Sequence, residues 1–189
     1  MRMYRIAMPL PLDDIPIERG EERVDYILTD KMIEELDKKF GFVENIGSGL
    51  WGVAYRLADG RVLKLTTDED EVAASTEIMN IKYGPFAKVY DVQEISDGKG
   101  HMLNYILKDY VQPLDESMAD LFDIFQDLPF DRESVVDEFR NSHPAEFKMF
   151  EDYTNDVLNY PFGDTLHSNN VGIDQNGQLV AFDPRTNRW

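Results

Sequence analysis

Apolar and polar positions along the first half of the chain predict a set of antiparallel strands. Residues 42–55 read as a strand, a glycine-rich loop and a second strand, and the chain then turns at residues 58–60 and returns over residues 61–65. Residues 88–94 and 102–107 form another predicted pair around a glycine-containing turn at residues 97–100. Short apolar segments joined by such turns are typical of antiparallel sheets.

Helical spacing precedes and follows these strands. One helix is expected to start with Asp30 as its N-cap and to stop at Gly41, with three apolar side chains on one face, Ile33, Leu36 and Phe40. Further helical patterns cover residues 67–82, 115–125 and 144–158, with a short amphipathic segment between the last two. Residues 1–28 carry no clear pattern, and their role stays open.

A short hairpin is predicted near the end of the chain. Residues 171–173 and 179–182 are apolar and are joined through Asn176-Gly177, which favours a tight turn because both residues tolerate positive φ. Asn170 precedes the first strand and Asp183 follows the second, so antiparallel pairing brings both oxygen ligands to one end. Two such ligands, completed by phosphate oxygens and water, suit Mg²⁺.

Composition narrows the function classes. The chain has 189 residues, 42% of them apolar, which is enough for one sizeable core or two small lobes. A net charge of −18 disfavours binding to nucleic acid or an anionic membrane and suits a basic protein partner. Without cysteine there are no disulfides or thiolate sites. No apolar run predicts a membrane span or secretory signal, so a cytoplasmic location is expected.

The glycine-rich loop carries the pattern G-x-G-x-x-G at Gly47, Gly49 and Gly52. A helix should follow these glycines in a dinucleotide-binding fold, whereas here a strand follows. The order strand, glycine loop, strand, turn and lysine-bearing strand is that of a kinase nucleotide lobe. The alternative is a plain glycine-rich hairpin with a solvated lysine.

Lys64 lies in the third of these strands and needs a partner or a ligand, because an unpaired buried ammonium group is costly. The helix over residues 67–82, capped by Thr67 or Asp68, offers carboxylates. Glu77 is the first choice of partner and Glu71 the second; alternatively, both are solvated.

The C-terminal motif resembles the catalytic loop and metal-binding segment of the protein-kinase-like superfamily. Phe162-Gly163-Asp164 stands where the aminoglycoside- and choline-kinase branch has H-G-D, and residues 166–171, L-H-S-N-N-V, stand where it has L-H-P-G-N-V. Phe182-Asp183 matches the strand end that presents the second metal ligand. Thr165 is one residue more than the family has, and an alternative register puts Thr165 in the aspartate's place. Pro184-Arg185 replaces the family's F-G.

The resemblance is nearest to phage-encoded, host-takeover serine/threonine protein kinases. It covers residues 42–183, through G-x-G-x-x-x-A-Y, V-x-K, V-Y-D-V-Q at residues 89–93, and an aspartate followed by H-S-x-N. It implies a two-lobed, α+β kinase-like fold with an antiparallel N-lobe sheet and a reduced helical C-lobe. The implied domains are an N-terminal extension and helix (1–41), a nucleotide-binding N-lobe (42–110) and a C-lobe (111–189).

The resemblance also assigns roles around ATP and Mg²⁺. The phosphates are covered by the glycine loop and bound by Lys64, with loop residues Gly47, Ser48, Gly49 and Gly52. Adenine is held by main-chain groups of Asp109 and Val111, and Leu107 lines the pocket. Mg²⁺ is held by Asn170 and Asp183. Catalysis involves Asp164, which takes or orients the acceptor's hydroxyl proton, and His167, which orients the loop or a phosphate.

The expected function is therefore an ATP- and Mg²⁺-dependent phosphotransferase acting on a protein hydroxyl, with a hydroxyl-bearing small molecule as another possible acceptor. Only six residues follow Asp183, which leaves no room for an activation segment or the later substrate-docking helices. Two alternatives stay open for that reason. One is a pseudokinase that binds a partner without catalysis, and the other is an acidic inhibitor that occupies a basic groove of a host enzyme.

Overall fold

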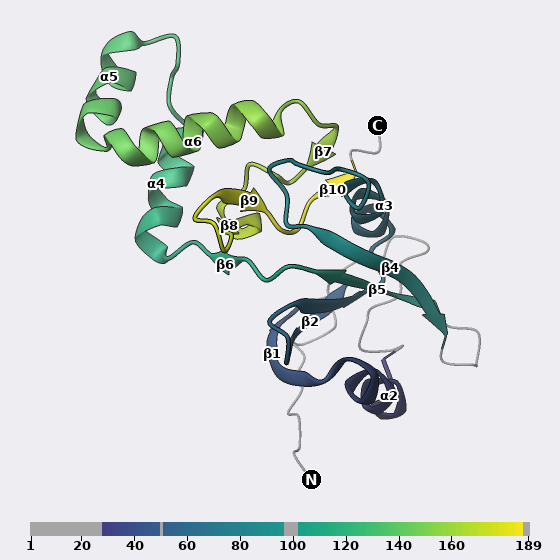
Figure 1. Cartoon of the computed structure of the whole chain (residues 1–189). Helices are drawn as coiled ribbons and strands as arrows, with labels where there is room; N and C mark the ends of the chain where they lie inside the picture. Colours follow the sequence, from purple (N-terminus) through teal and green to yellow (C-terminus); the bar gives the residue numbers. More distant parts are fainter. Residues whose placement is uncertain (1–27, 50, 97–101, 187–189) are drawn as a thin grey trace, which may run out of the picture. The chain divides into compact units, whose positions relative to one another are not determined.

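The computed structural model describes residues 28–49, 51–96 and 102–186. Within these residues the protein is of mixed α+β class, with five α-helices and a five-stranded antiparallel sheet (Figure 1). The chain divides into two compact units: the first contains Met1–Val72 and Val89–Asp109, and the second contains Ala73–Lys88 and Tyr110–Trp189. The α+β class predicted from the sequence is confirmed. Residues 1–27, the predicted turn at 97–100, and Leu50 lie outside the described residues.

The first unit is built on the five-stranded sheet, whose order is β1-β2-β3-β5-β4. All neighbouring strands are antiparallel, as predicted for short apolar segments joined by turns, and β3 also pairs with β5. The strands are β1 (Phe42–Ser48), β2 (Gly52–Leu57), β3 (Val62–Thr66), β4 (Val89–Ser96) and β5 (Met102–Lys108). The central strand, β3, therefore has a partner on both edges.

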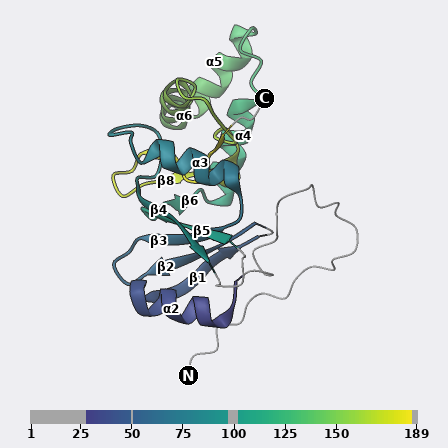
Figure 2. The same ribbon diagram turned by 90° about the vertical axis from the view of Figure 1, so that its right-hand side faces the viewer.

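Helix α2 (Asp30–Phe40) covers one face of this sheet (Figure 2). Its buried side chains, Met32, Ile33 and Leu36, pack on the apolar residues of β2, β3 and β5. The N-cap is Thr29, whose hydroxyl accepts a hydrogen bond from Met32 N at 3.3 Å, so the prediction of Asp30 was one residue late. Gly41 ends the helix with φ +71°, as predicted.

The sheet has an apolar face under α2 and a more polar opposite face. Leu63 and Leu65 are fully buried on the α2 face, and Lys64 lies between them on the other. In the β3–β5 ladder Ile106 is opposite Lys64 and Leu107 is opposite Leu63. Leu107 was predicted to line the adenine pocket, but its side chain belongs to the core under α2.

Helix α3 (Glu69–Ile78) follows β3 after two residues and is shorter than the sequence pattern indicated. Of the two cap candidates, Asp68 is the one whose carboxylate accepts from the first turn: Asp70 N donates at 3.0 Å and Glu71 N at 3.2 Å. Helical structure stops at Ile78, and residues 79–88 continue as turns and irregular chain.

The second unit contains the three helices α4 (Glu116–Gln126), α5 (Glu133–Ser142) and α6 (Pro144–Val157). The two predicted helices, over residues 115–125 and 144–158, are confirmed as α4 and α6, and the short amphipathic segment between them forms α5. Their apolar faces share an aromatic core in which Phe125 contacts Phe147 and Phe150 at ring-centroid distances of 5.4 and 5.6 Å. Asp115 caps α4, accepting from Met118 N at 2.9 Å. This core supports the short strands that follow α6 in sequence.

Two small sheets complete the second unit. One has the order β6-β8-β9, and the other pairs β7 with β10. Their elements are β6 (Gln112–Pro113), β7 (Phe162–Gly163), the 3₁₀ turn η1 (Ser168–Asn170), β8 (Val171–Ile173), β9 (Leu179–Ala181) and β10 (Arg185–Thr186). The predicted hairpin is the β8–β9 pair, in which Val171 faces Ala181.

The turn of this hairpin differs from the prediction. Gly177 has φ +78°, but Asn176 does not adopt positive φ. Among the non-glycine residues of the described segments, only Asp164 does. Asp174 organises the turn instead, since its Oδ1 accepts from the backbone N–H groups of Asn176 and Gln178, both at 2.8 Å. A side-chain acceptor at the start of a turn can replace a second left-handed residue.

Candidate functional site

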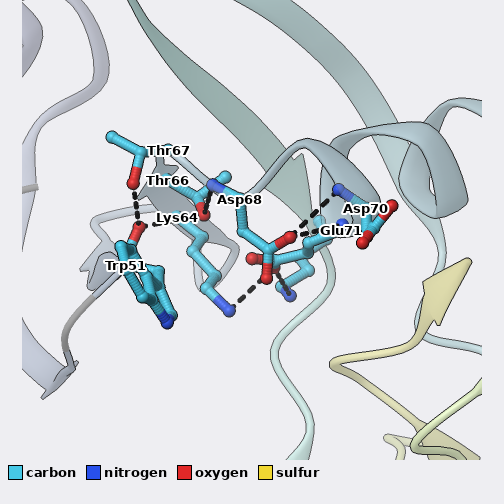
Figure 3. A network of polar contacts seen from close by, with 8 residues as sticks. Trp51, Lys64, Thr66, Thr67, Asp68, Asp70 and Glu71 are labelled. Carbon is cyan, nitrogen blue, oxygen red and sulfur yellow. Dashed lines mark hydrogen bonds and ion pairs between the residues drawn. The ribbon is translucent and has the colours of Figure 1, made fainter. Parts of the chain in front are cut away.

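A cluster of buried ionic side chains lies on the polar face of the first unit's sheet (Figure 3). Lys64 Nζ on β3 is 2.7 Å from Glu71 Oε1 on α3, and Lys108 Nζ on β5 is 3.7 Å from the same oxygen. Their side chains are 16%, 4% and 8% exposed, in that order. At this burial the three charges depend on one another, because none is fully solvated.

The partner of Lys64 is Glu71, so the first choice, Glu77, was wrong and the second was right. Helix α3 begins three residues after β3 ends, which places its first turn beside Lys64. Glu77 is six residues farther, about 9 Å along the axis and about two-thirds of a turn around it. Its side chain is exposed.

Threonine and aspartate hydrogen bonds fix the first turn of α3 to the glycine loop. Thr66 is fully buried; its hydroxyl donates to Trp51 O at 3.1 Å and accepts from Asp68 N at 3.1 Å. Thr67 N also donates to Trp51 O, at 2.8 Å. The loop base, the end of β3 and the helix that carries Glu71 thus form one connected unit (Figure 3). Sequence analysis did not single out Thr66 or Lys108, and only the β3–β5 register shows that Lys108 shares the face of Lys64.

The glycines of the loop differ in how much space surrounds them. A Cβ at Gly52 would lie 3.0 Å from both Lys64 Cε and Leu65 O, so this glycine makes room for the lysine side chain. Gly47 and Gly49 have open space around them. Gly49 N donates to Gly52 O at 2.8 Å, and Ser48 faces Val53 in the β1–β2 ladder. The structure therefore places Gly52 beside Lys64, while Gly47 and Gly49 leave the backbone approachable.

Asp109 and Val111 were predicted to hold adenine through their main chains, and their side chains make different kinds of contact. The Asp109 carboxylate accepts from the Tyr90 hydroxyl at 2.8 Å. Burial, and then this hydrogen bond, raise the pKa of Tyr90. The Val111 side chain is buried against Ala87 and Val180. Both side chains are thus engaged, and the adenine-binding role of their main chains stays a prediction.

Asp164 stands out in the second unit because its backbone has φ +57° while its side chain is exposed. Positive φ is uncommon for residues other than glycine and is a form of local strain found at functional sites. The next residue, Thr165, is only 5% exposed, and its carbonyl accepts a hydrogen bond from the Tyr153 hydroxyl. Burial raises the pKa of Tyr153, which keeps it a donor. The exposed carboxylate, and not the buried threonine, is available for chemistry.

Asn170 and Asp183 lie at the open end of the β8–β9 hairpin. Phe182 N donates to Asn170 O at 2.9 Å, and Asn170 Nδ2 donates to Asp164 O at 3.1 Å. Arg185 pairs with Gly163 in the β7–β10 ladder. Asp183 is therefore held between two ladders, alongside the loop that runs from Asp164 to Asn170.

This donor set fits Mg²⁺ bound together with phosphate. Asn170 and Asp183 offer hard oxygen atoms, and Mg²⁺ usually takes one or two protein groups plus substrate phosphates and water. In the part of the chain that the structure describes, no group of three or more His, Asp or Glu side chains could hold a metal. Binding of Mg²⁺ by Asn170 and Asp183 stays a prediction.

His167 and Ser168 shape the loop between Asp164 and Asn170. His167 is exposed, and its Nδ1 accepts from Asn169 N at 3.2 Å. Ser168 Oγ donates to Asp123 Oδ2 on α4 at 2.9 Å, a contact that sequence reasoning missed because the two residues are 45 positions apart. The structure gives His167 a local role in the turn, and its contact with a phosphate stays a prediction.

No protein-family model matches this chain, and no curated protein does. Its function must therefore be argued from its own residues. None of the helices in the described ranges is long and apolar enough to cross a membrane.

Each unit offers one kind of chemistry. The first presents lysine ammonium groups beside a glycine turn with approachable backbone, which suits a phosphate-bearing ligand. The second presents a carboxamide, a carboxylate and an exposed, strained aspartate along one loop and hairpin, which suits a divalent cation and a proton acceptor.

Proposed function

We propose that this chain is an ATP- and Mg²⁺-dependent phosphotransferase with a two-lobed, protein-kinase-like fold. The observation that carries the proposal is the ion pair between Lys64 and Glu71, formed from adjacent elements directly after a glycine-rich β1–β2 turn. A lysine on the third strand, paired with a helix glutamate, is the arrangement that orients ATP phosphates in kinases.

In this proposal the first unit binds the phosphates of the nucleotide. Lys64 binds the α- and β-phosphates, and backbone N–H groups of the loop from Gly47 to Gly52 cover them. Gly52 supports this role, because a side chain there would displace the lysine. The main-chain groups of Asp109 and Val111 hold the adenine.

The second unit supplies the groups for transfer. Asn170 and Asp183 hold Mg²⁺, which neutralises phosphate charge when bound. Asp164 accepts the proton of the acceptor hydroxyl while the oxygen of that hydroxyl forms a bond to the γ-phosphorus of ATP. The bond between the γ-phosphorus and the β–γ bridging oxygen breaks, and ADP leaves. The exposure of Asp164 and the hydrogen bond from Asn170 to its carbonyl support this role. His167 holds the turn between them.

The proposed acceptor is a serine or threonine hydroxyl of a protein. A net charge of −18 favours a basic protein over an acidic one. The sequence resemblance further suggests a phage-encoded enzyme that acts on host proteins in the host cytoplasm.

A second candidate is a kinase-like protein that binds nucleotide without transferring phosphate. Thr165 favours it, because this additional residue changes the spacing between Asp164 and Asn170, and its buried side chain fixes the new spacing. In that case the biological effect comes from a bound partner. An acidic inhibitor that binds no nucleotide is the third possibility.

The first test is calorimetric ATP binding with and without Mg²⁺, on the wild type, Asp183→Ala and the control Asp120→Ala, an exposed carboxylate on α4. We expect Mg²⁺ to strengthen ATP binding in the wild type and the control. Removing one of two protein ligands to the metal should abolish most of that enhancement, about tenfold or more in affinity.

The outcomes separate the three candidates. No binding at millimolar ATP would overturn the nucleotide proposal and favour the acidic inhibitor. Mg²⁺-dependent binding, followed by phosphate transfer that Asp164→Asn abolishes, supports the enzyme. Binding without transfer to any basic protein or small alcohol supports the second candidate.

A further inference from the structure

Besides Lys64, the first unit holds a buried lysine that the proposed reaction does not use. Lys108 ends β5, two residues after Ile106, which pairs with Lys64 in the β3–β5 ladder. Lys108 and Lys64 therefore lie on the same face of the sheet. Their ammonium groups approach the same oxygen, Glu71 Oε1, at 3.7 and 2.7 Å.

Burial distinguishes the two lysines. The Lys64 side chain is 16% exposed, Lys108 is 8% exposed and Glu71 is 4% exposed. The carboxylate of Asp68, also buried, is engaged with the first backbone N–H groups of α3. Lys64 is thus the cation of this cluster best able to reach a ligand, while Lys108 stays with Glu71.

We propose that Lys108 is a positioning residue: it keeps Glu71 charge-compensated when Lys64 engages the phosphates of a ligand. This inference rests on the proposed function, which assigns Lys64 to the phosphates. A buried carboxylate that loses its counter-ion is strongly destabilised. With Lys108 in place, part of the compensation remains, so Lys64 can share its charge with a phosphate at lower cost. Lys108 thereby sets the affinity for the polyphosphate group without touching it.

The test measures calorimetric affinity for ATP with Mg²⁺ and for inorganic tripolyphosphate, well below the unfolding temperature. We expect Lys108→Met to weaken both by about tenfold, within the usual coupling of contacting residues. Lys108→Arg should restore most of the affinity. The matched control is Lys31→Met on α2, a lysine whose side chain is 84% exposed and paired with Glu35; it should leave affinity unchanged.

A double variant separates positioning from a general structural role. If Lys108 acts only through Glu71, removing it should have no further effect once the carboxylate is gone. Glu71→Gln with Lys108→Met should therefore bind as tightly as Glu71→Gln alone, and more tightly than Lys108→Met. The comparison of the double variant with Glu71→Gln remains available if Lys108→Met does not fold.

The inference would be overturned if Lys108→Met bound both probes with wild-type affinity. It would also be overturned if the double variant bound them with lower affinity than Glu71→Gln. A wild type that binds no ATP contradicts the proposed function. In that case tripolyphosphate binding weakened by Lys108→Met would still support the inference, whereas no binding of either probe overturns both.

Discussion

At the residue scale, the site depends on how few residues separate β3 from α3. The sequence indicated that Lys64 needs a partner or a ligand, and the helix that follows offers several carboxylates. Choosing among them requires the helix start, which Asp68 fixes by capping the first turn. Glu71 then falls beside Lys64 and Glu77 points away. Residue type was predictable here, but position along the helix was not.

The two glutamates should differ sharply in their effect on stability. Glu71→Gln removes the carboxylate between Lys64 and Lys108, and breaking a buried pair costs about 3 kcal/mol or more. Glu77→Gln changes an exposed side chain and should alter the free energy of unfolding by less than about 0.5 kcal/mol. Urea denaturation of both variants measures the difference. Equal effects would contradict the assignment of Glu71.

At the element scale, the alternating and helical patterns predicted the strands of the large sheet and the helices of the second unit. The patterns did not predict the helix cap and the turn in which side-chain hydrogen bonds determine the backbone conformation. Thr29 caps α2 in place of Asp30, and Asp174 organises the β8–β9 turn without a left-handed Asn176. The pairing of β7 with β10 was not predictable either, because two-residue strands carry no periodicity.

Gly172 on β8 provides a test of the small sheet that carries Asn170. A Cβ at this position would lie 2.7 Å from Val111 Cγ1 and closer still to Gln112 O on β6. Because backbone cannot move aside easily, Gly172→Ala should destabilise the fold by about 1–3 kcal/mol. Gly47→Ala is the matched control, since its Cβ would meet no atom within 4 Å. Thermal unfolding of both variants decides the point, and similar midpoints would contradict the β6–β8 packing.

At the scale of the whole molecule, the order of sequence motifs implied an α+β protein, and that class is confirmed, while composition indicated an acidic surface. The two compact units could not be outlined from sequence alone, because residues 73–88 belong with the second unit although they lie between strands of the first. Contacts such as that of Phe86 with Ala181 decide this membership. The assignment of ATP and Mg²⁺ stays a proposal.

The net charge of −18 predicts that salt stabilises the protein. Repulsion among like surface charges disfavours the compact state, and raising ionic strength from about 0.01 to about 0.15 M shortens the screening length from about 30 to about 8 Å. The midpoint of thermal unfolding should therefore rise with NaCl, and equally with choline chloride. A midpoint that falls with salt would show that attractive ion pairs outweigh this repulsion.

The strand order β1-β2-β3-β5-β4 also has a consequence for how the first unit assembles. Strands β1 to β3 form from neighbouring hairpins, and β4 with β5 forms another, so local contacts create two modules early in folding. Joining them requires β3 to pair with β5 across a long chain separation, which is the slower, entropically costly step. Lys108 arrives on β5, so Glu71 gains its second cation only when the modules join. The Lys64–Glu71 pair joins residues close in sequence and can form before that step, whereas the Lys108–Glu71 pair cannot.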